Sequence, residues 1–571
     1  MIHDIWKTRK GIYNWYNRTN TTWGNLLNNT ADVYKDVEAI IYKDRRLNFS
    51  QLRRHVDDFA RGLLEIGISS GDNVGLWMTN CPEWVISQFA IYKIGARLVP
   101  INTRYCLKEL EYVLKQSDCK GLIMNDMFLA KTNAMDMIEQ IMPERGRKKK
   151  EDDNNDIKLR HIICLSKNGK RYSNTLDYQD VLELGYSHRS DGLLEKIEQQ
   201  VSPSDIMSIQ YTSGTTGFPK GVMCTHRSNM ASFFCTGVGF GYRNGEDRMI
   251  VSLPFFTNYG ALGCSATSIL FGVTMVVLEQ YDPEVSLRLI EKEKITISHG
   301  SDNMYINILK HERFDKYDVS SLRGGLMGGG HNPVDVIKEV LKIVPEISLG
   351  YGLTENSGFG SMALYDDPIE KRLHTSGRPI PYTKMCIKDN GTNDVIANGN
   401  IGEICTHDVL PNSSVMIGYY KKEKETKETI DKDGWLHTGD LGYFDEDGYL
   451  IVTGRLKDMF TAGGNNVYPA EIENYLYTHP LIKHVAVVGL PDEVKGSVPM
   501  AYVVLKEGTK VEPGDIIDYC RNNITSYKVP RYIEFIDELP LTSSGKVQKF
   551  ELKERGIKKF GLEEISRKRK M

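Results

Sequence analysis

The stretch YTSGTTGFPKG, residues 211–221, combines three glycines, serine and threonine hydroxyls and one lysine, directly after the apolar-alternating run 206–210. Glycine lets backbone N–H groups approach an anion closely, hydroxyls donate to phosphate oxygens, and lysine adds a mobile positive charge. The stretch therefore predicts a phosphate-binding loop, with a purely structural turn as the alternative.

Two common nucleotide motifs do not fit. The lysine of a Walker A loop follows a glycine and precedes Ser or Thr, whereas Lys220 follows Phe218-Pro219 and precedes Gly221. A second glycine pattern, GVGFG at 237–241, has no acidic residue placed to bind a ribose. We therefore discount both a Walker-type loop and a dinucleotide-binding fold.

The flanking sequence predicts an α/β fold. From residue 50 to 126, amphipathic helices alternate with short apolar strands, which is typical of a doubly wound sheet, and similar alternation fills 160–350. From about 380 to 454, short strands with Gly and Asp-Gly turns predict a β-rich subdomain. The last segment, 455–571, reads as a small α+β domain. We thus expect an N-terminal domain over 1–454 and a C-terminal domain over 455–571.

Composition excludes several classes of function. The 571 residues carry a net charge of −3, which gives no general basis for nucleic-acid binding. The ten cysteines form no CxxC pair and no Cys/His cluster at zinc spacing, so we expect reduced thiols in a cytoplasmic protein. The N-terminal segment lacks the apolar core of a signal peptide.

Two unusual segments have ordinary interpretations. The apolar run 261–278 is interrupted by Gly, Ser and Thr, which favours a buried helix followed by a strand over a bilayer span. The charged run 144–156 has no apolar face, which indicates a solvated loop; a partner-binding charge run is the alternative.

The opening stretch resembles the signature loop of the adenylate-forming superfamily, which includes acyl-CoA synthetases, luciferases and the adenylation domains of peptide synthetases. The resemblance covers about residues 30–555. Within the superfamily, the sequence is most similar to fatty and medium-chain acyl-CoA synthetases. Further segments follow in the family's order: LPFFTNYG at 253, MGGGHNP at 327, GYGLTEN at 350, SGRP at 376, GWLHTGDLG at 434, GRLKD at 454, GGNNVYPAEIE at 463 and PLTSSGKVQK at 540.

This resemblance implies an ATP site. It assigns catalytic roles to Lys546, Glu355, Thr354 and Lys220. It assigns nucleotide binding to Thr212, Ser213, Gly214, Thr215, Thr216, Gly217, Lys220, Gly329, Gly330, His331, Tyr351, Gly352, Thr354, Asp440, Arg455 and Lys546. A carboxylate is a hard oxygen ligand, so Glu355 is expected to hold Mg²⁺. The alternatives are a surface acid for Glu355, a capping role for Asp440, ordinary packing for His331 and a solvated side chain for Lys546.

The resemblance also implies a moving C-terminal domain. Its hinge is expected at Lys457, and rotation would withdraw Lys546 and bring Gly463 and Gly464 beside CoA. Those two glycines alone would also be consistent with a turn. One position departs from the family: Thr257 stands where a histidine commonly helps place the substrate carboxylate, and Asn258 is the candidate replacement.

The expected function is ATP-dependent activation of a fatty, medium-chain or aromatic carboxylic acid to an acyl-adenylate, followed by transfer to CoA. ATP, Mg²⁺ and CoA are the expected cofactor and co-substrates. The first alternative is a stand-alone adenylation enzyme that loads a separate carrier protein, and the second is a non-catalytic nucleotide-binding interaction protein. Acyl pockets are formed by residues far apart in the chain, so the sequence does not define the acid.

Overall fold

The computed structural model describes residues 20–129, 132–142, 157–190, 192–212, 218–328, 334–521, 523–541 and 547–568. Contacts between residues divide the chain into two compact units. The first is formed by residues up to Gly328 together with 336–385 and 406–436, and the second mainly by 386–405 and 437–571.

The first unit contains an eight-stranded sheet in the order β22-β11-β10-β4-β3-β5-β8-β9. Pairing is parallel from β10 to β9 and antiparallel from β10 to β11 and from β11 to β22. Its strands are β3 (Asn73–Trp77), β4 (Arg97–Pro100), β5 (Cys119–Asn125), β8 (His161–Leu165), β9 (Leu176–Asp177), β10 (Ile206–Thr212), β11 (Lys220–Thr225) and β22 (Gly418–Tyr419). The antiparallel edge therefore carries the predicted phosphate loop.

A seven-stranded sheet of the same unit has the order β16-β15-β14-β12-β13-β1-β2 and is parallel except for the β1–β2 pair. Its strands are β1 (Glu38–Tyr42), β2 (Arg45–Asn48), β12 (Arg248–Val251), β13 (Thr274–Val277), β14 (Ile297–Ser298), β15 (Gly324–Leu326) and β16 (Glu346–Ser348). Two small antiparallel sheets are formed by β17 (Gly350–Leu353), β18 (Gly358–Met362) and β19 (Arg378–Pro379), and by β6 (Met127–Phe128) and β7 (Thr132–Asn133).

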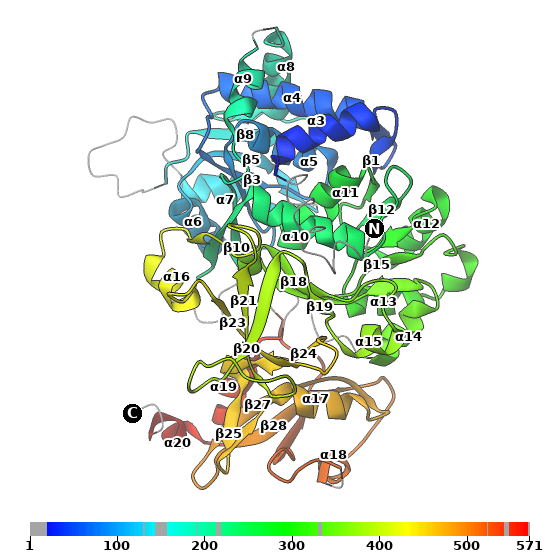
Figure 1. Ribbon diagram of the computed structural model, residues 1–571, viewed down its shortest axis with the longest axis vertical. Coiled ribbons are helices and arrows are strands. Elements are labelled where there is room, and N and C mark those ends of the chain that lie inside the picture. Colours follow the sequence, from blue (N-terminus) through cyan, green and yellow to red (C-terminus); the bar gives the residue numbers. More distant parts are fainter. Residues whose placement is uncertain are drawn as a thin grey trace. The chain divides into compact units, whose positions relative to one another are not determined.

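Helices cover these sheets, and α3, α4 and α8 pack side by side in Figure 1. A capping box of Asn48 and Gln51 starts α4, and one of Thr225 and Ser228 starts α10. The unit contains α3 (Trp23–Val33), α4 (Phe49–Glu65), α5 (Pro82–Lys93), α6 (Leu107–Gln116), α7 (Ala134–Ile141), α8 (Tyr178–Ser187), α9 (Leu193–Gln200), α10 (His226–Gly239), η1 (Tyr259–Ala266), α11 (Thr267–Phe271), α12 (Pro283–Glu293), α13 (Asp302–Leu309), η2 (Phe314–Lys316), α14 (Val334–Leu341), η3 (Thr354–Asn356), α15 (Ile369–His374) and α16 (Glu423–Thr429).

The second unit is built on two sheets. Four strands, β20 (Thr383–Lys388), β21 (Gly402–Asp408), β23 (Leu436–Phe444) and β24 (Leu450–Arg455), form one sheet. The other contains β25 (Phe460–Ala462), β26 (Asn465–Val467), β27 (Ile482–Asp492), β28 (Gly496–Leu505) and β29 (Tyr532–Phe535). Its helices are η4 (Leu456–Asp458), α17 (Pro469–Tyr477), α18 (Pro513–Arg521), α19 (Lys549–Lys559) and α20 (Glu563–Lys568).

The predicted α/β architecture is confirmed, with two mainly parallel sheets and a smaller α+β unit. Contacts group 437–454 with the C-terminal residues, whereas the sequence analysis assigned them to the N-terminal domain. The boundary after 454 and the hinge at Lys457 stay predictions.

The apolar run 261–278 forms the end of η1, then α11 and β13, so the expected helix followed by a strand is confirmed. Within the described ranges, no helix combines the length and apolar character needed to cross a membrane. The charged run 144–156 lies outside the described residues.

Candidate active site

The hairpin of β10 and β11 presents the two ends of the predicted phosphate loop to each other. Thr212 and Lys220 are cross-strand partners at the loop end of this hairpin. The Thr212 hydroxyl lies 3.5 Å from the Lys220 carbonyl oxygen. The loop's central residues, 213–217, lie outside the described part of the chain. The register therefore places a threonine hydroxyl and a lysine at the base of this loop.

Glu355 lies beside these two residues. It belongs to the short helix η3, which follows β17, and its backbone carbonyl accepts a hydrogen bond from the Met416 N–H at 2.9 Å. Its Oε1 accepts a hydrogen bond from the Tyr419 hydroxyl at 3.1 Å and lies 3.5 Å from the Thr212 Oγ1. Two separate segments thus contact one half-buried carboxylate, and a third contacts the backbone of the same residue.

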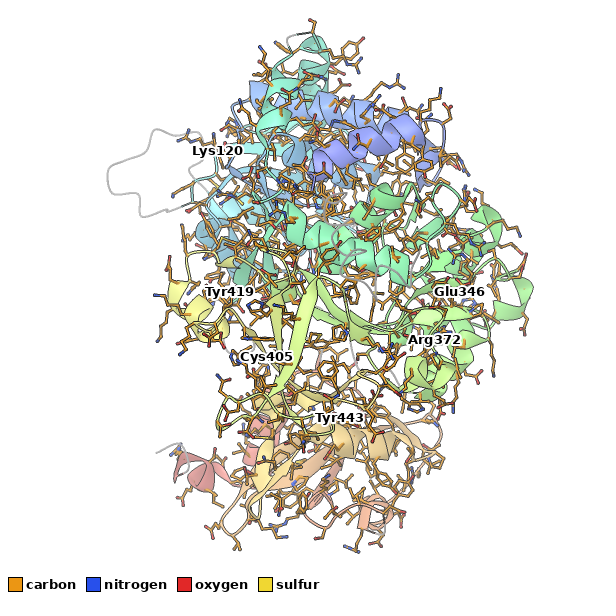
Figure 2. All side chains as sticks on the ribbon, in the orientation of Figure 1. Lys120, Glu346, Arg372, Cys405, Tyr419 and Tyr443 are labelled. Carbon is orange, nitrogen blue, oxygen red and sulfur yellow. The ribbon has the colours of Figure 1, made fainter. Side chains whose placement is uncertain are left out.

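Tyr419 was not predicted as a site residue. It lies on β22, which pairs with β11 so that Tyr419 stands opposite Val222, and Figure 2 labels it near α16. The Lys220 Nζ lies 4.0 Å from the centroid of its ring, a cation–π contact. Burial and the charge of Glu355 raise the pKa of Tyr419, so its hydroxyl remains a donor at neutral pH. Tyr419 therefore connects the lysine to the acid.

The predicted adenine-binding segment begins on β17. Tyr351 is buried there, and Gly352 is exposed and pairs across to Phe359. A Cβ atom at Gly352 would lie 1.9 Å from the Gly358 carbonyl oxygen, so the backbone permits only glycine at this position. The carbonyl oxygen of the half-buried Thr354 lies 3.8 Å from the Cys224 sulfur.

Thr257, at the position where the family commonly has a histidine, uses its hydroxyl within its own segment. Its hydroxyl donates to the Pro254 carbonyl at 2.8 Å and accepts from the Gly260 N–H at 3.0 Å, so it serves the start of η1. Asn258 follows, and its buried Oδ1 has no hydrogen-bond partner among the described residues. Asn258 therefore has an unpaired acceptor among the described residues, and the roles of Thr257 and Asn258 toward a substrate stay predictions.

The buried His299 was not predicted as a site residue; it contacts Leu326, which precedes the predicted segment 327–333, and Tyr259 of the predicted segment 253–260. The Leu326 N–H donates to the Nδ1 of His299 at 2.9 Å, so this nitrogen is an acceptor and the proton is on Nε2. Nε2 then donates to the Tyr242 hydroxyl at 2.6 Å, and the Tyr259 hydroxyl lies 3.2 Å from Nδ1. Burial lowers the pKa of His299 to about 3, which keeps the ring neutral.

In the second unit, Asp440 and Arg455 are cross-strand partners on β23 and β24. The Arg455 Nε lies 3.1 Å from the Asp440 Oδ1, and the Asp440 N–H donates to the Thr438 hydroxyl at 3.1 Å. That hydroxyl in turn donates to the Ile404 carbonyl at 2.7 Å. A buried acid is thus fixed within β23, with an arginine beside it.

Three further predicted residues lie in the second unit. Lys457 is exposed on η4, and the exposed Gly463 and Gly464 form the β25–β26 turn with φ of +58° and +81°. Their predicted roles in the hinge and in CoA binding stay predictions. The following predicted residues lie outside the described part of the chain: Ser213, Gly214, Thr215, Thr216, Gly217, Gly329, Gly330, His331 and Lys546.

Two family models match the chain. The model described as AMP-binding enzyme matches residues 27–420, and the model described as AMP-binding enzyme C-terminal domain matches 471–546. The chain is 39% identical over 550 residues to YngI of Bacillus subtilis (strain 168), which is named as an acyl-CoA synthetase; the alignment covers 95% of this chain and 98% of that protein.

A second relative is the mitochondrial medium-chain acyl-CoA ligase of Danio rerio, which is 34% identical over 95% of this chain and 89% of its own length. Among solved structures, an anthranilate CoA ligase in complex with anthranoyl-AMP is similar with a TM-score of 0.81 and 27% identity, over 95% of this chain and 98% of that chain. Relatives and structure agree on one family.

Proposed function

The chain belongs to the AMP-binding enzyme family, among its acyl-CoA synthetases, and from this premise we propose that it joins a fatty, medium-chain or aromatic carboxylic acid to CoA through an acyl-adenylate. The observation that carries the proposal is the contact of Thr212 and Tyr419 with the Glu355 carboxylate, together with the packing of Lys220 on the Tyr419 ring, at the loop end of the β10–β11 hairpin. This arrangement supplies hydroxyl, cationic and carboxylate groups where a triphosphate needs them.

In the first half-reaction, a carboxylate oxygen attacks the α-phosphorus of ATP. A bond forms between that oxygen and phosphorus, the bond from phosphorus to the bridging oxygen breaks, and pyrophosphate leaves. The barrier comes mainly from bringing negative groups together, so positioning and charge neutralisation are the protein's contribution. Lys220 at the loop and Lys546 of the C-terminal segment are the proposed cations.

Glu355 fits the expected Mg²⁺ ligand. It offers a hard carboxylate oxygen, and the hydroxyl of Tyr419 orients that oxygen, as outer hydrogen bonds orient metal ligands elsewhere. When bound, Mg²⁺ would neutralise charge on the ATP phosphates. The chain's own contribution at this point is the direction in which the Glu355 carboxylate is held.

We propose that Tyr351 and Gly352 flank the adenine, because an aromatic ring lies beside a position where backbone can approach a flat base. Asp440 is proposed to bind the ribose hydroxyls with Arg455 beside it. Asn258 is proposed to orient the substrate carboxylate by donating from its Nδ2 group, since the Thr257 hydroxyl is hydrogen-bonded at the start of η1.

In the second half-reaction, the CoA sulfur attacks the acyl carbonyl, its proton is released, and the bond from carbon to AMP breaks. We propose that the C-terminal domain rotates about Lys457 between the two steps, so that Lys546 leaves and Gly463 and Gly464 pass beside the pantetheine arm. The backbone of the two glycines favours this role because both have positive φ and no side chain to obstruct a narrow passage.

The test is a panel of carboxylic acids of graded length together with aromatic acids. Each is incubated with ATP and Mg²⁺, with and without CoA, and pyrophosphate, AMP and thioester are measured. We expect AMP and an acyl-CoA for one class of acid. Pyrophosphate release with no thioester on free CoA would favour a carrier protein as the acceptor, and no acid-dependent pyrophosphate would reject the proposal.

We also propose a reducing compartment, the cytoplasm, because all ten cysteines are free thiols and nine are buried or half-buried. Fractionation of cells of the source organism tests this; recovery only from an oxidising compartment would contradict it.

A further inference from the structure

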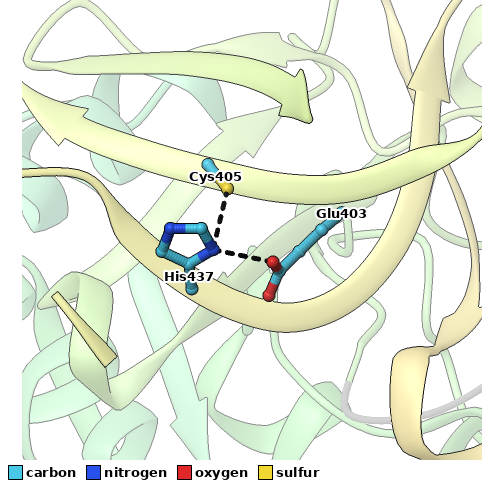
Figure 3. Close-up of side chains that lie close together, drawn as sticks. All are labelled: Glu403, Cys405 and His437. Carbon is cyan, nitrogen blue, oxygen red and sulfur yellow. Dashed lines mark hydrogen bonds and ion pairs between the residues drawn. The ribbon is translucent and has the colours of Figure 1, made fainter. Parts of the chain in front are cut away.

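Three potential metal ligands converge within the second unit. Glu403 and Cys405 are two residues apart on β21, so their side chains leave the same face of the strand, and His437 lies on the neighbouring strand β23. One ligand atom from each lies within 4.8 Å of the other two. Figure 3 shows all three side chains pointing to one place between the strands.

The convergence is on a single atom, Nδ1 of His437. Oε2 of Glu403 lies 2.7 Å from it, and Sγ of Cys405 lies 3.7 Å from it. Nδ1 has one position in the ring plane, so a single proton there can serve only one of these two neighbours at a time. A metal ion at that position would be shared by all three.

This geometry does not match a nucleophilic triad. In such triads the nucleophile and the acid bind opposite nitrogens of the histidine, whereas here the thiol and the carboxylate both approach Nδ1. An ordinary Glu–His pair explains the 2.7 Å contact, but it does not require a buried cysteine sulfur to face the same nitrogen.

We propose that Glu403, Cys405 and His437 form a Zn²⁺-binding site. Thiolate and imidazole together favour a borderline-soft ion over Mg²⁺ or Ca²⁺. Zinc lies about 2.3 Å from sulfur and about 2.0–2.1 Å from nitrogen, so a tetrahedral centre separates these two ligands by roughly 3.6 Å. The observed 3.7 Å is close to that separation, and the carboxylate has to withdraw from Nδ1 by roughly 0.6 Å to leave room for the ion.

A backbone hydrogen bond orients the Glu403 carboxylate toward the proposed site. Oε1 of Glu403 accepts a hydrogen bond from the Gly439 N–H at 2.9 Å, which leaves Oε2 to face the site. Such a second hydrogen bond is usual for carboxylates that bind metals. Three protein ligands leave a fourth position for water. Because Gly439 immediately precedes Asp440, zinc would connect β21 to the part of β23 that carries this acid, and it would stabilise that segment.

The experiment uses the full-length, untagged protein, reduced and treated with a chelator that is then removed. Co²⁺ is added as a spectroscopic probe and Zn²⁺ as the competitor. We expect one equivalent of Co²⁺ to give a thiolate-to-metal charge-transfer band and the strong visible bands of a tetrahedral ion, and one equivalent of Zn²⁺ to abolish both. Absence of the charge-transfer band in the wild-type protein would overturn the proposal.

Variants assign the site. Cys405→Ser and His437→Gln are expected to lose the band, and Glu403→Gln to weaken Co²⁺ binding at least tenfold. Cys106→Ser removes an exposed thiol elsewhere and serves as the matched control. We expect this variant to keep the charge-transfer band. A band that survives Cys405→Ser, or that disappears in Cys106→Ser, would reject the assignment.

A second readout does not depend on the folding of the variants. Zn²⁺ that binds the native chain raises the midpoint of thermal unfolding of the wild-type protein, and the increase saturates at one equivalent. No increase would contradict the proposal. Neither measurement requires acyl-CoA formation, so the result is independent of the proposed function.

Discussion

The Tyr419 hydroxyl donates a hydrogen bond of 3.1 Å to Oε1 of Glu355, across 64 residues of sequence. The same ring lies under the Lys220 ammonium group, 4.0 Å from centroid to Nζ. A tyrosine therefore contacts the expected Mg²⁺ ligand through its hydroxyl and the proposed phosphate-binding cation through its ring. Both contacts depend on the β22–β11 pairing that places Tyr419 at the sheet edge.

Replacing Tyr419 with Phe keeps the ring under Lys220 and removes only the hydroxyl. A hydrogen bond to a charged group contributes about 1.5–3 kcal/mol, and partial exposure places this one at the lower end. We expect the Mg²⁺-ATP concentration for half-maximal pyrophosphate release to rise about tenfold. Titration of Mg²⁺ at fixed ATP measures the change.

The neighbouring Tyr420 provides the matched control. Its hydroxyl donates to Asp118 at 3.0 Å, away from Glu355, so Tyr420→Phe should leave the Mg²⁺ dependence unchanged. If Tyr419→Phe behaves like Tyr420→Phe, the hydroxyl does not orient the acid.

Lys546→Ala separates the two half-reactions. Loss of one charge contact to a transferring group typically lowers the rate about 10²- to 10³-fold. We expect acid-dependent pyrophosphate release to fall by that amount, because the proposed cation is missing. Thioester formation from a supplied acyl-adenylate should continue near the wild-type rate, since the lysine is proposed to leave before that step. Equal losses in both assays would contradict the proposed alternation.

Gly352→Ala tests the backbone approach at the adenine segment. The new Cβ would meet the Gly358 carbonyl oxygen at 1.9 Å, so β17 and β18 have to separate. We expect a destabilisation of about 1–3 kcal/mol and weaker ATP binding, measured by urea unfolding and by calorimetry. Gly514→Ala is the control, because no heavy atom lies within 4 Å of its added Cβ and α18 should keep its stability. An unchanged Gly352→Ala protein would show that the strands yield easily.

The sequence predicted the elements whose signals are local. The glycine-rich loop and the helix–strand alternation are patterns within short windows, so the α/β fold, Thr212 and Lys220 could be named in advance, and the family resemblance added Glu355. Tyr419 could not, because its role comes from an edge strand of two residues that pairs with β11. Periodicity over two residues carries no signal.

Partnerships between distant residues were missed for the same reason. His299 contacts tyrosines 57 and 40 residues away, and His437 contacts a cysteine 32 residues away. Metal sites are recognised in a sequence by Cys and His residues a few positions apart. Cys405 and His437 are far apart in sequence and come together only because β21 and β23 are neighbouring strands. Thr257 was named because of its position in a family segment, and only the structure shows that its hydroxyl serves the start of η1.

Two buried histidines make the folding stability of the protein sensitive to acid. Burial lowers the pKa of both His226 and His299 to about 3, below the ordinary value of 6.5. Between these values the unfolded chain binds a proton at each histidine and the native chain does not, so stability falls as the pH falls below about 6.5. Each histidine contributes a loss of about 1.4 kcal/mol per pH unit in that range. Urea unfolding followed by fluorescence at a series of pH values from about 7 to about 5 measures the slope.

His299→Gln removes one of these two proton uptakes. We expect the variant to be less stable at neutral pH, because the hydrogen bonds to Tyr242 and Leu326 are altered, but its stability should change less steeply with pH than that of the wild type. His374→Gln changes an exposed histidine and should reproduce the wild-type slope. If His299→Gln retains the full slope, the ring is not held neutral in the native state, and the assignment of its proton to Nε2 loses its basis.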